Sequence, residues 1–130
     1  MVDDRMNTHQ LSFGTIVVLD RHTAEVIVNE GVEMDLGAVH EYHTFLADRL
    51  QPPFCLLINK LNGYTYTFEA QLELGNLKGI CAMAVLTYNR ATRVSTENLA
   101  ALPRTQPWNM RLFEERDAAL AWLDEQAAEA

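Results

Sequence analysis

Hydrophobic and polar positions change period several times along the chain. Residues 11–20 and 23–30 are rich in β-branched side chains and are separated by two residues, a pattern that predicts an antiparallel hairpin. Apolar positions then recur at helical spacing over residues 36–50, between a candidate N-cap at Asp35 and the helix-breaking Pro52. The first part of the chain therefore predicts two strands followed by a helix.

The rest of the chain alternates short apolar runs with helical patterns. We expect strands at residues 54–58, 80–88 and 109–113, and helices at 67–75, 92–102 and 115–129. Such alternation implies right-handed crossovers between parallel strands. The predicted fold class is α/β, with a mostly parallel five-stranded sheet that is opened by an antiparallel hairpin and accompanied by four helices.

Length and hydropathy indicate one domain. The chain has 130 residues, of which 48% are hydrophobic, as in an ordinary globular domain. We expect a flexible N-terminal tail at residues 1–9 and a single domain at 10–130. The apolar runs are shorter than the roughly 20 residues that span a bilayer, and the first ten residues lack the pattern of an export signal. The expected location is the cytoplasm, with no membrane partner.

Charge and cysteine usage exclude further classes. The formal net charge is −8 and the ten basic residues form no run, whereas nucleic-acid binding needs clustered Lys and Arg. We therefore expect no nucleic-acid partner. Cys55 and Cys81 lie inside apolar strand-like runs, which favours buried free thiols over a disulfide or a metal site.

The common catalytic and cofactor motifs are missing from the sequence. The six glycines match no phosphate-binding loop, and no C-x-x-C, H-E-x-x-H or G-x-S-x-G occurs. His40 and His43 lie one helical turn apart and could share a metal ion, but His43 falls on the apolar stripe, which favours packing. Because nothing pairs an acid, a base and a nucleophile, we expect no catalytic residues, no cofactor and no metal.

Two amide and cation pairs follow neighbouring predicted strands. Asn59 and Lys60 end one strand, and Asn89 and Arg90 follow the next. Open α/β sheets collect ligands at this edge, so these four residues are ligand-binding candidates for a small anion or an apolar metabolite. The alternative is that the two cations offset nearby carboxylates.

Two helices carry more apolar surface than a single sheet can cover. Phe45 lies opposite the apolar stripe of the first helix, and the second helix is apolar on two sides. Surplus apolar surface of this kind indicates a partner. We predict a homodimer with interface candidates at Phe45, Ala70, Leu74 and Leu77.

The order of elements resembles that of the STAS and STAS-like (SpoIIAA-like) family. The resemblance spans roughly residues 11–125 and rests on the turn at residues 62–67 and on Leu112 and Phe113 followed by the Ala-Ala-Leu-Ala-Trp-Leu segment at 118–123. It implies a non-catalytic regulatory module that binds proteins, namely its own copy or another regulatory protein. The alternative is a small-ligand binding or sensing protein.

The same resemblance suggests two phosphorylation candidates. Family members that antagonise anti-sigma factors carry Asp-Ser-Ser-Gly at the start of the second helix, where a kinase modifies a serine. This chain has Thr65 and Thr67 in the sequence Thr-Tyr-Thr-Phe instead, without the Asp and Gly. A hydroxyl at a helix N-terminus suits an added phosphate, but Thr67 is equally suited to act as an ordinary N-cap.

Overall fold

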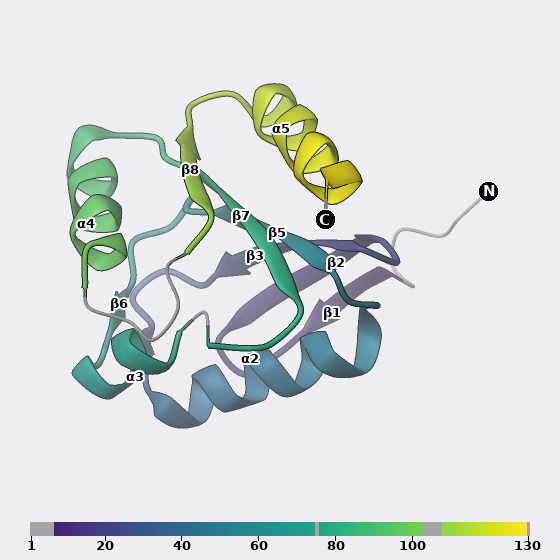
Figure 1. Ribbon diagram of the computed structural model, residues 1–130. Helices are drawn as coiled ribbons and strands as arrows, with labels where there is room; N and C mark the ends of the chain where they lie inside the picture. The colour runs from purple at the N-terminus through teal and green to yellow at the C-terminus, as the bar shows by residue number, and fades with distance from the viewer. Residues whose placement is uncertain (1–6, 75, 103–107, 130) are drawn as a thin grey trace.

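The computed structural model describes residues 7–74, 76–102 and 108–129. Its centre is a six-stranded sheet with strand order β1-β2-β3-β5-β7-β8, seen edge-on between the helices in Figure 1. The elements run in the order β1 (Thr8–Gln10), β2 (Gly14–Asp20), β3 (Thr23–Val28), β4 (Glu33–Met34), α2 (Leu36–Arg49), β5 (Phe54–Asn59), β6 (Thr65–Tyr66), α3 (Phe68–Glu73), β7 (Ile80–Leu86), α4 (Arg90–Ala100), β8 (Met110–Phe113) and α5 (Arg116–Glu129).

The pairing of the strands confirms the predicted fold class. β2 and β3 form the expected antiparallel hairpin, and its turn is held by a 2.7 Å hydrogen bond from the His22 amide to the Asp20 carboxylate. β3 with β5, β5 with β7, and β7 with β8 are parallel pairs. The molecule is therefore an α/β protein with a mixed, mostly parallel sheet.

The sheet has six strands, so the predicted number of five is wrong. The additional strand β1 pairs antiparallel with β2, with Thr8 opposite Val17. Thr8 and His9 come from the expected tail, whereas residues 1–6 of that tail lie outside the described residues. The sequence does not predict β1 because its three residues are too few and too polar to show a hydrophobic period. This edge strand forms through backbone hydrogen bonds, which side-chain patterns do not encode.

Three helices begin at a residue whose side chain caps the first turn: Asp35 for α2, Thr67 for α3 and Asn89 for α4. Asp35 accepts a 2.8 Å hydrogen bond from the Ala38 amide, which confirms the predicted N-cap of α2. Asn89 accepts from the Thr92 amide at 2.8 Å. Since Asn89 is the cap, α4 begins two residues earlier than the sequence pattern indicated. Each cap satisfies an amide that the first turn of a helix leaves without an intrahelical acceptor.

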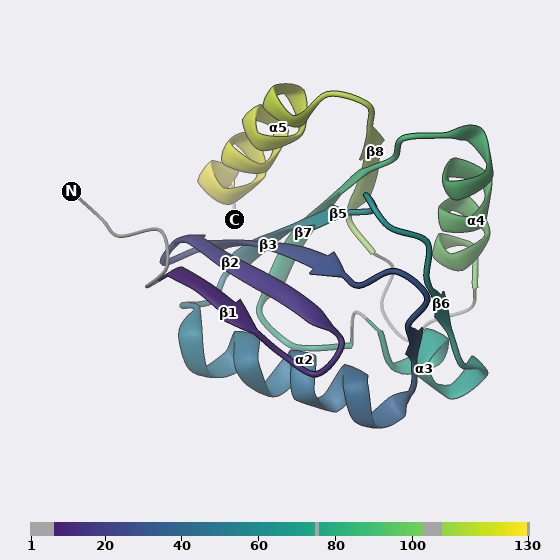
Figure 2. The same cartoon turned by 180° about the vertical axis from the view of Figure 1, so that it is seen from behind.

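Helices cover both faces of the sheet, as Figures 1 and 2 show. On one face, α2 and α3 enclose the larger core, which includes Phe13, Ile16, Leu46 and Leu56. On the other face, α5 packs on β5 and β7 through a smaller core. α4 lies where the parallel strands end. Among the helices of the described segments, none has the length and apolar character required to cross a membrane.

Candidate functional site

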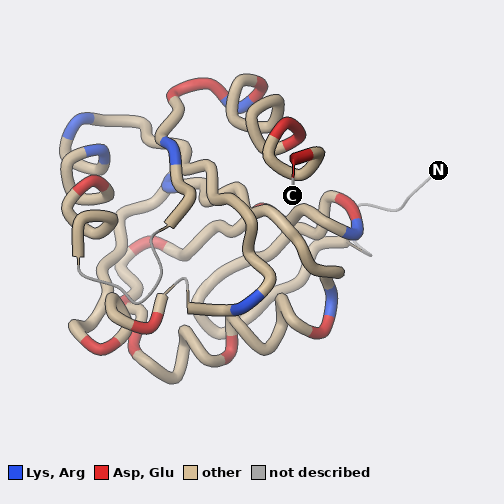
Figure 3. The backbone as a smooth tube through the Cα atoms, in the orientation of Figure 1, with Lys and Arg blue, Asp and Glu red and all other residues tan. Residues whose placement is uncertain are grey.

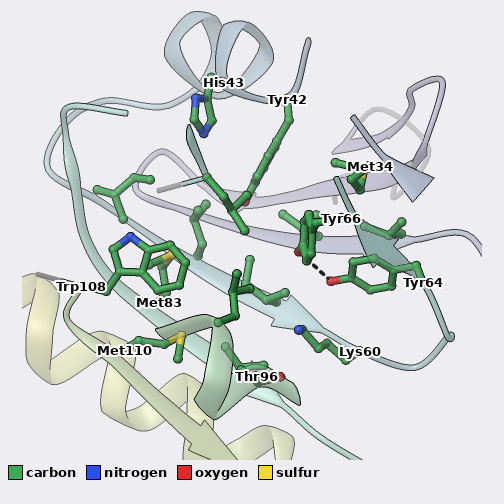
Figure 4. A pocket seen from close by; sticks show the side chains of 18 residues that line it. Met34, Tyr42, His43, Lys60, Tyr64, Tyr66, Met83, Thr96, Trp108 and Met110 are labelled. Atoms are coloured by element: carbon green, nitrogen blue, oxygen red, sulfur yellow. Dashed lines mark hydrogen bonds between the residues drawn. The ribbon is translucent and has the colours of Figure 1, made fainter. Parts of the chain in front are cut away.

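A small internal cavity lies between the sheet and α2, close to α4. Its volume is about 40 Å³ and its walls are almost entirely apolar. Apart from aliphatic side chains, Figure 4 shows what lines it: Met34, Tyr42, His43, Lys60, Tyr64, Tyr66, Met83, Thr96, Trp108 and Met110. This volume has room for about three water-sized groups, because one water-sized probe occupies roughly 10–15 Å³.

An open cleft of about 390 Å³ adjoins this cavity. Four side chains line both spaces, so they form the boundary between the surface and the interior: Lys60, Tyr64, Tyr66 and Leu99. Polar residues of α3 and α4 line the outer part of the cleft, namely Gln71, Ser95 and Asn98. The site therefore has a polar mouth and an apolar interior.

Backbone hydrogen bonds fix the residues at this boundary. The Lys60 amide donates to the Leu86 carbonyl at 3.1 Å, which holds the end of β5 beside the end of β7. The chain then returns along β4, where the Thr65 amide donates to the Val32 carbonyl at 3.0 Å. Because side chains alternate along an extended segment, Tyr64 and Tyr66 point to the same side and line the cleft together.

Lys60 is a half-buried cation that has no carboxylate partner in the described chain. Its ammonium nitrogen lies 5.5 Å from the ring centroid of Tyr64 and 5.9 Å from that of Tyr66. Both distances suit a cation–π interaction. Partial burial lowers the pKa of Lys60 to about 8, because the charged form loses hydration that no anion replaces.

The two tyrosines stay neutral and share one hydrogen bond. Their hydroxyl oxygens lie 3.1 Å apart, as the dashed line in Figure 4 marks. Burial raises the pKa of Tyr64 to about 12 and that of Tyr66 well above its ordinary value. When one hydroxyl donates to the other, the accepting hydroxyl still has its own proton. The pair therefore presents one O–H group that can donate to a ligand.

His43 contributes a second polar group to the wall of the cavity. Its side chain is 9% exposed, and its Nε2 atom has no hydrogen-bond partner among the described residues. Burial lowers the pKa of His43, so the imidazole is neutral at pH 7. The prediction of a packed histidine is confirmed. His40 is exposed, and the described segments bring together no group of three side chains that could ligate a metal ion.

Of the four predicted ligand-binding residues, Lys60 alone lies at this site. Asn59 donates to the buried Glu25 carboxylate at 2.9 Å and accepts from the Tyr88 hydroxyl at 2.8 Å. Asn89 is the cap of α4, and Arg90 is exposed. The two amides therefore have local polar partners already, and ligand binding at Asn59, Asn89 or Arg90 stays a prediction.

Arg90 lies instead in a second, larger groove of about 670 Å³. This groove also contains Arg93 and two carboxylates, Glu97 and Glu114. Arg93 forms a 3.2 Å ion pair with Glu114 between two well-exposed side chains. Because the charges of this groove offset one another, whereas the cleft at Lys60 adjoins an apolar cavity, we favour the cleft at Lys60 as the functional site.

The phosphorylation candidates occupy different positions. The Thr67 hydroxyl accepts a 3.2 Å hydrogen bond from the Ala70 amide, which confirms its role as the cap of α3. Thr65 is exposed and lines the cleft. Modification of either hydroxyl stays a prediction.

The predicted interface residues do not form an exposed apolar patch, and this prediction is corrected. Ala70 is fully buried and Leu74 is 9% exposed, while Leu77 packs against the core. The centroid of the Phe45 ring lies 5.0 Å from that of the His9 ring, and the guanidinium carbon of Arg49 lies over the Phe45 ring, 5.4 Å from its centroid. The physical reason is twofold: α3 turns its other side outward, and the unpredicted strand β1 brings His9 against Phe45.

Comparisons with protein-family models, curated proteins and solved structures found no match to this chain.

The buried Glu25 carboxylate supports an ion pair whose loss we expect to be costly. Arg116 Nη1 lies 2.6 Å from Glu25 Oε1, and the Glu25 side chain is 7% exposed. Arg116→Met should lower the free energy of unfolding by about 1.5–3 kcal/mol, since it leaves a buried charge with less compensation but the arginine itself is partly screened by water. Urea denaturation measures this loss.

The matched control for that substitution is Arg93→Met. Arg93 also pairs with a glutamate, but both side chains are well exposed, so its loss should cost less than about 1 kcal/mol. Equal effects of the two substitutions would contradict the structural role of Glu25.

Proposed function

We propose that the protein is a non-catalytic binding protein for a small amphipathic molecule with an apolar body and an anionic head, such as a medium-chain carboxylate. The observation that carries this proposal is the position of Lys60, a half-buried cation without a carboxylate partner in the described chain, at the boundary between an open cleft and an apolar cavity. We further propose that it acts in the cytoplasm, without a nucleic-acid or membrane partner.

Charge supports an anionic head group. The chain has 18 acidic residues and a formal net charge of −8, yet Lys60 has only the faces of two tyrosine rings beside it. Figure 3 shows the other basic residues of the described segments spread over several elements, with Arg90 and Arg93 sharing α4, and interspersed with acidic ones. A ligand carboxylate at Lys60 would supply the missing counter-charge. It would accept one hydrogen bond from the Lys60 ammonium group and one from the free O–H of the tyrosine pair, and hydrogen bonds to a carboxylate are strong.

Packing supports an apolar body. Three methionines line the cavity: Met34, Met83 and Met110. Methionine side chains adapt their shape readily, so the cavity can enlarge to admit the end of an alkyl chain. Two side chains of α4 line the cavity: Thr96, the one buried residue of this helix, and the half-buried Leu99. The open cleft, at about 390 Å³, falls within the range of small-molecule sites.

The test is a comparison of three probes by isothermal titration calorimetry at pH 7. Decanoate has both the head and the chain, decanol lacks the charge, and acetate lacks the chain. We expect decanoate to bind at least about tenfold more tightly than decanol, since a charge-assisted hydrogen bond contributes about 1.5–3 kcal/mol, and acetate to show no binding. Equal affinity for decanol and decanoate, or no binding of either, would overturn the proposal.

The affinity for decanoate should depend on pH through Lys60. The protonated amine binds the carboxylate and the neutral amine does not, so affinity is constant below about pH 7 and falls as pH rises through the pKa of about 8. Above that pKa the affinity should fall by up to about tenfold per pH unit, until the pH reaches the higher pKa that Lys60 has in the decanoate complex. Tyr64 does not interfere, because its pKa is about 12.

Titration calorimetry at pH 6.5, 7.5, 8.5 and 9.5, chosen to bracket that range, measures this profile. Lys60→Met is the control and should give a flat profile. A flat profile for the wild-type protein would assign the anion to another cation.

A second candidate function is the STAS-like protein-interaction module, acting as a homodimer or on another regulatory protein. The observation that favours it is the outer side of α3, where Phe68 is 65% exposed and Leu72 is 41% exposed. These side chains lie four residues apart and so share one face of the helix. An exposed apolar pair of this kind is typical of a contact surface.

This second candidate predicts that Phe68→Glu prevents self-association. Burying the exposed part of these four side chains in a two-fold contact gains about 3–6 kcal/mol, because Phe68 is 65% and Leu72 41% exposed in the monomer, and this gain is comparable with the lower estimates of the cost of association. Because the net free energy of dimerisation is small, we choose a protein concentration of about 100 μM. Light scattering should then find a dimeric wild type and a monomeric Phe68→Glu variant. Leu61→Glu is the control, since Leu61 is equally exposed but not on α3. A monomeric wild type would contradict the dimer.

A further inference from the structure

Two thiols meet beneath α5, on the face of the sheet opposite the cavity. The Sγ atoms of Cys55 on β5 and Cys81 on β7 are 2.8 Å apart, although 26 positions separate them in the sequence. The Cys55 thiol also lies 3.8 Å from the Leu123 carbonyl of α5. Both cysteines are free. The sequence predicts two buried free thiols in separate strands, but nothing in it indicates that they touch.

An irregularity in β7 produces this contact. Phe54 pairs with Ile80, but Cys55 pairs with Ala82, so Cys81 is one residue too many on its strand. In a regular pleat, Cys81 would point to the face opposite Ala82. A β-bulge re-aims the side chain of the extra residue, and here it brings the Cys81 thiol to the face on which Cys55 lies.

Hydrogen bonds hold the bulge against α5. The Asn109 side-chain amide donates to the Cys81 carbonyl at 3.1 Å and to the Gln126 side chain at 2.7 Å. Gln126 belongs to α5. The thiol pair is therefore fixed from three sides, by β5, by the bulge and by the helix above it, rather than placed by chance in a mobile loop.

We propose that Cys55 and Cys81 form a reversible redox site that closes to a disulfide in response to a hydroperoxide. A sulfur–sulfur bond is about 2.05 Å long, so the two atoms need to approach by less than 1 Å. This proposal is independent of the ligand site at Lys60, because the two sites lie on opposite faces of the sheet.

The reaction has two steps, and the difference in burial orders them. Cys81 is half-buried, whereas Cys55 is fully buried, and burial together with the neighbouring thiol raises the pKa of Cys55. The Cys81 thiolate attacks the peroxide, the O–O bond breaks, and Cys81 becomes a sulfenic acid while water leaves with the proton of the thiol. The Cys55 sulfur then attacks the Cys81 sulfur, the S–O bond breaks, and the proton of Cys55 leaves with the oxygen as a second water. Two thiols and one hydrogen peroxide thus give one disulfide and two waters, whereas an organic hydroperoxide gives its alcohol in place of the first water.

Closure would link the starts of β5 and β7 and enclose the segment that carries Lys60, Tyr64 and α3. A cross-link over a loop of this length restricts the unfolded chain. We therefore expect the oxidised protein to melt at least about 5 °C above the reduced protein.

The experiment treats the reduced 130-residue protein with hydrogen peroxide and measures the intact mass after alkylation in denaturant. Because the chain contains two cysteines, the result is unambiguous. We expect a mass about 2 Da below that of the reduced chain, no alkylation, and full recovery of both thiols with dithiothreitol. A gain of about 32 Da at Cys81 with Cys55 still alkylated, or a disulfide between two chains, would overturn the proposal.

Cys55→Ser tests the role of the partner thiol. Without Cys55 the sulfenic acid at Cys81 has nothing to resolve it, so peroxide should give the sulfinic acid instead of the disulfide. A variant that resists peroxide altogether would show that Cys81 is not the thiol that reacts first. If the serine variant does not fold, the mass of the oxidised wild-type protein still decides the proposal.

Discussion

Leu123→Ala is expected to lower the free energy of unfolding by about 2–5 kcal/mol. Leu123 is 1% exposed and belongs to the smaller core, between α5 and the sheet. The sheet residues beneath it include Ala82 and Ala84, which are too small to fill the space that the lost side chain leaves. The cost therefore combines lost burial with a persistent cavity.

Urea denaturation followed by circular dichroism measures this loss. Leu120→Ala is the matched control, since Leu120 lies on the same helix but is half-buried and should cost roughly half as much or less. A change below about 1 kcal/mol for Leu123→Ala would mean that α5 does not cover this face of the sheet.

Lys60→Met is expected to weaken decanoate binding by about 10- to 150-fold, which corresponds to the loss of one charge-assisted hydrogen bond. Methionine keeps most of the aliphatic stem and removes the ammonium group. Since that group has no carboxylate partner among residues 7–74, 76–102 and 108–129, its removal should leave folding stability unchanged or increase it. A loss of affinity in this variant therefore cannot be attributed to unfolding.

Arg90→Met is the control for the position of the anion. Arg90 lies in the other groove, so this variant should bind decanoate as the wild-type protein does. The ligand site would lie elsewhere if Arg90→Met lost as much affinity as Lys60→Met, or if Lys60→Met lost none.

Most of the architecture could be predicted because it rests on local signals. The hairpin, α2 and α5 each combine a clear period with strong starting or ending residues, such as Asp35 before α2 and Pro52 after it. The sequence did not predict β1, because this edge strand pairs with β2 through backbone hydrogen bonds, which no side-chain pattern reveals. The short pair of β4 and β6 escaped for the same reason.

The candidate site could be predicted only in part. The position of Lys60 follows from topology, since strand ends gather ligands in open α/β sheets. The roles of Asn59 and Asn89 could not be predicted, because both amides have partners that only the folded chain brings near: Glu25 and Tyr88 for the former, and the first turn of α4 for the latter. The sequence does carry one signal for Tyr64 and Tyr66, an alternating aromatic pair four and six positions after Lys60.

The interface prediction was wrong for a related reason. A helical wheel shows that α3 is apolar on two sides, but it does not show which side faces the core. The tertiary structure buries Ala70 and Leu74 and exposes Phe68 and Leu72. The bulge that joins Cys55 and Cys81 is likewise invisible in the sequence, because the period of an apolar strand does not reveal one extra residue.

We propose that an amphipathic anion binds between the open cleft and the apolar cavity. The most direct measurement is a titration of the isotopically labelled protein with decanoate, followed by amide and methyl resonances in two-dimensional NMR spectra. We expect the largest shifts at Lys60, Tyr66, Met83 and Leu99, which line the two adjoining spaces. Shifts confined to Arg90 and Arg93 in the other groove, or no saturable shifts, would contradict it.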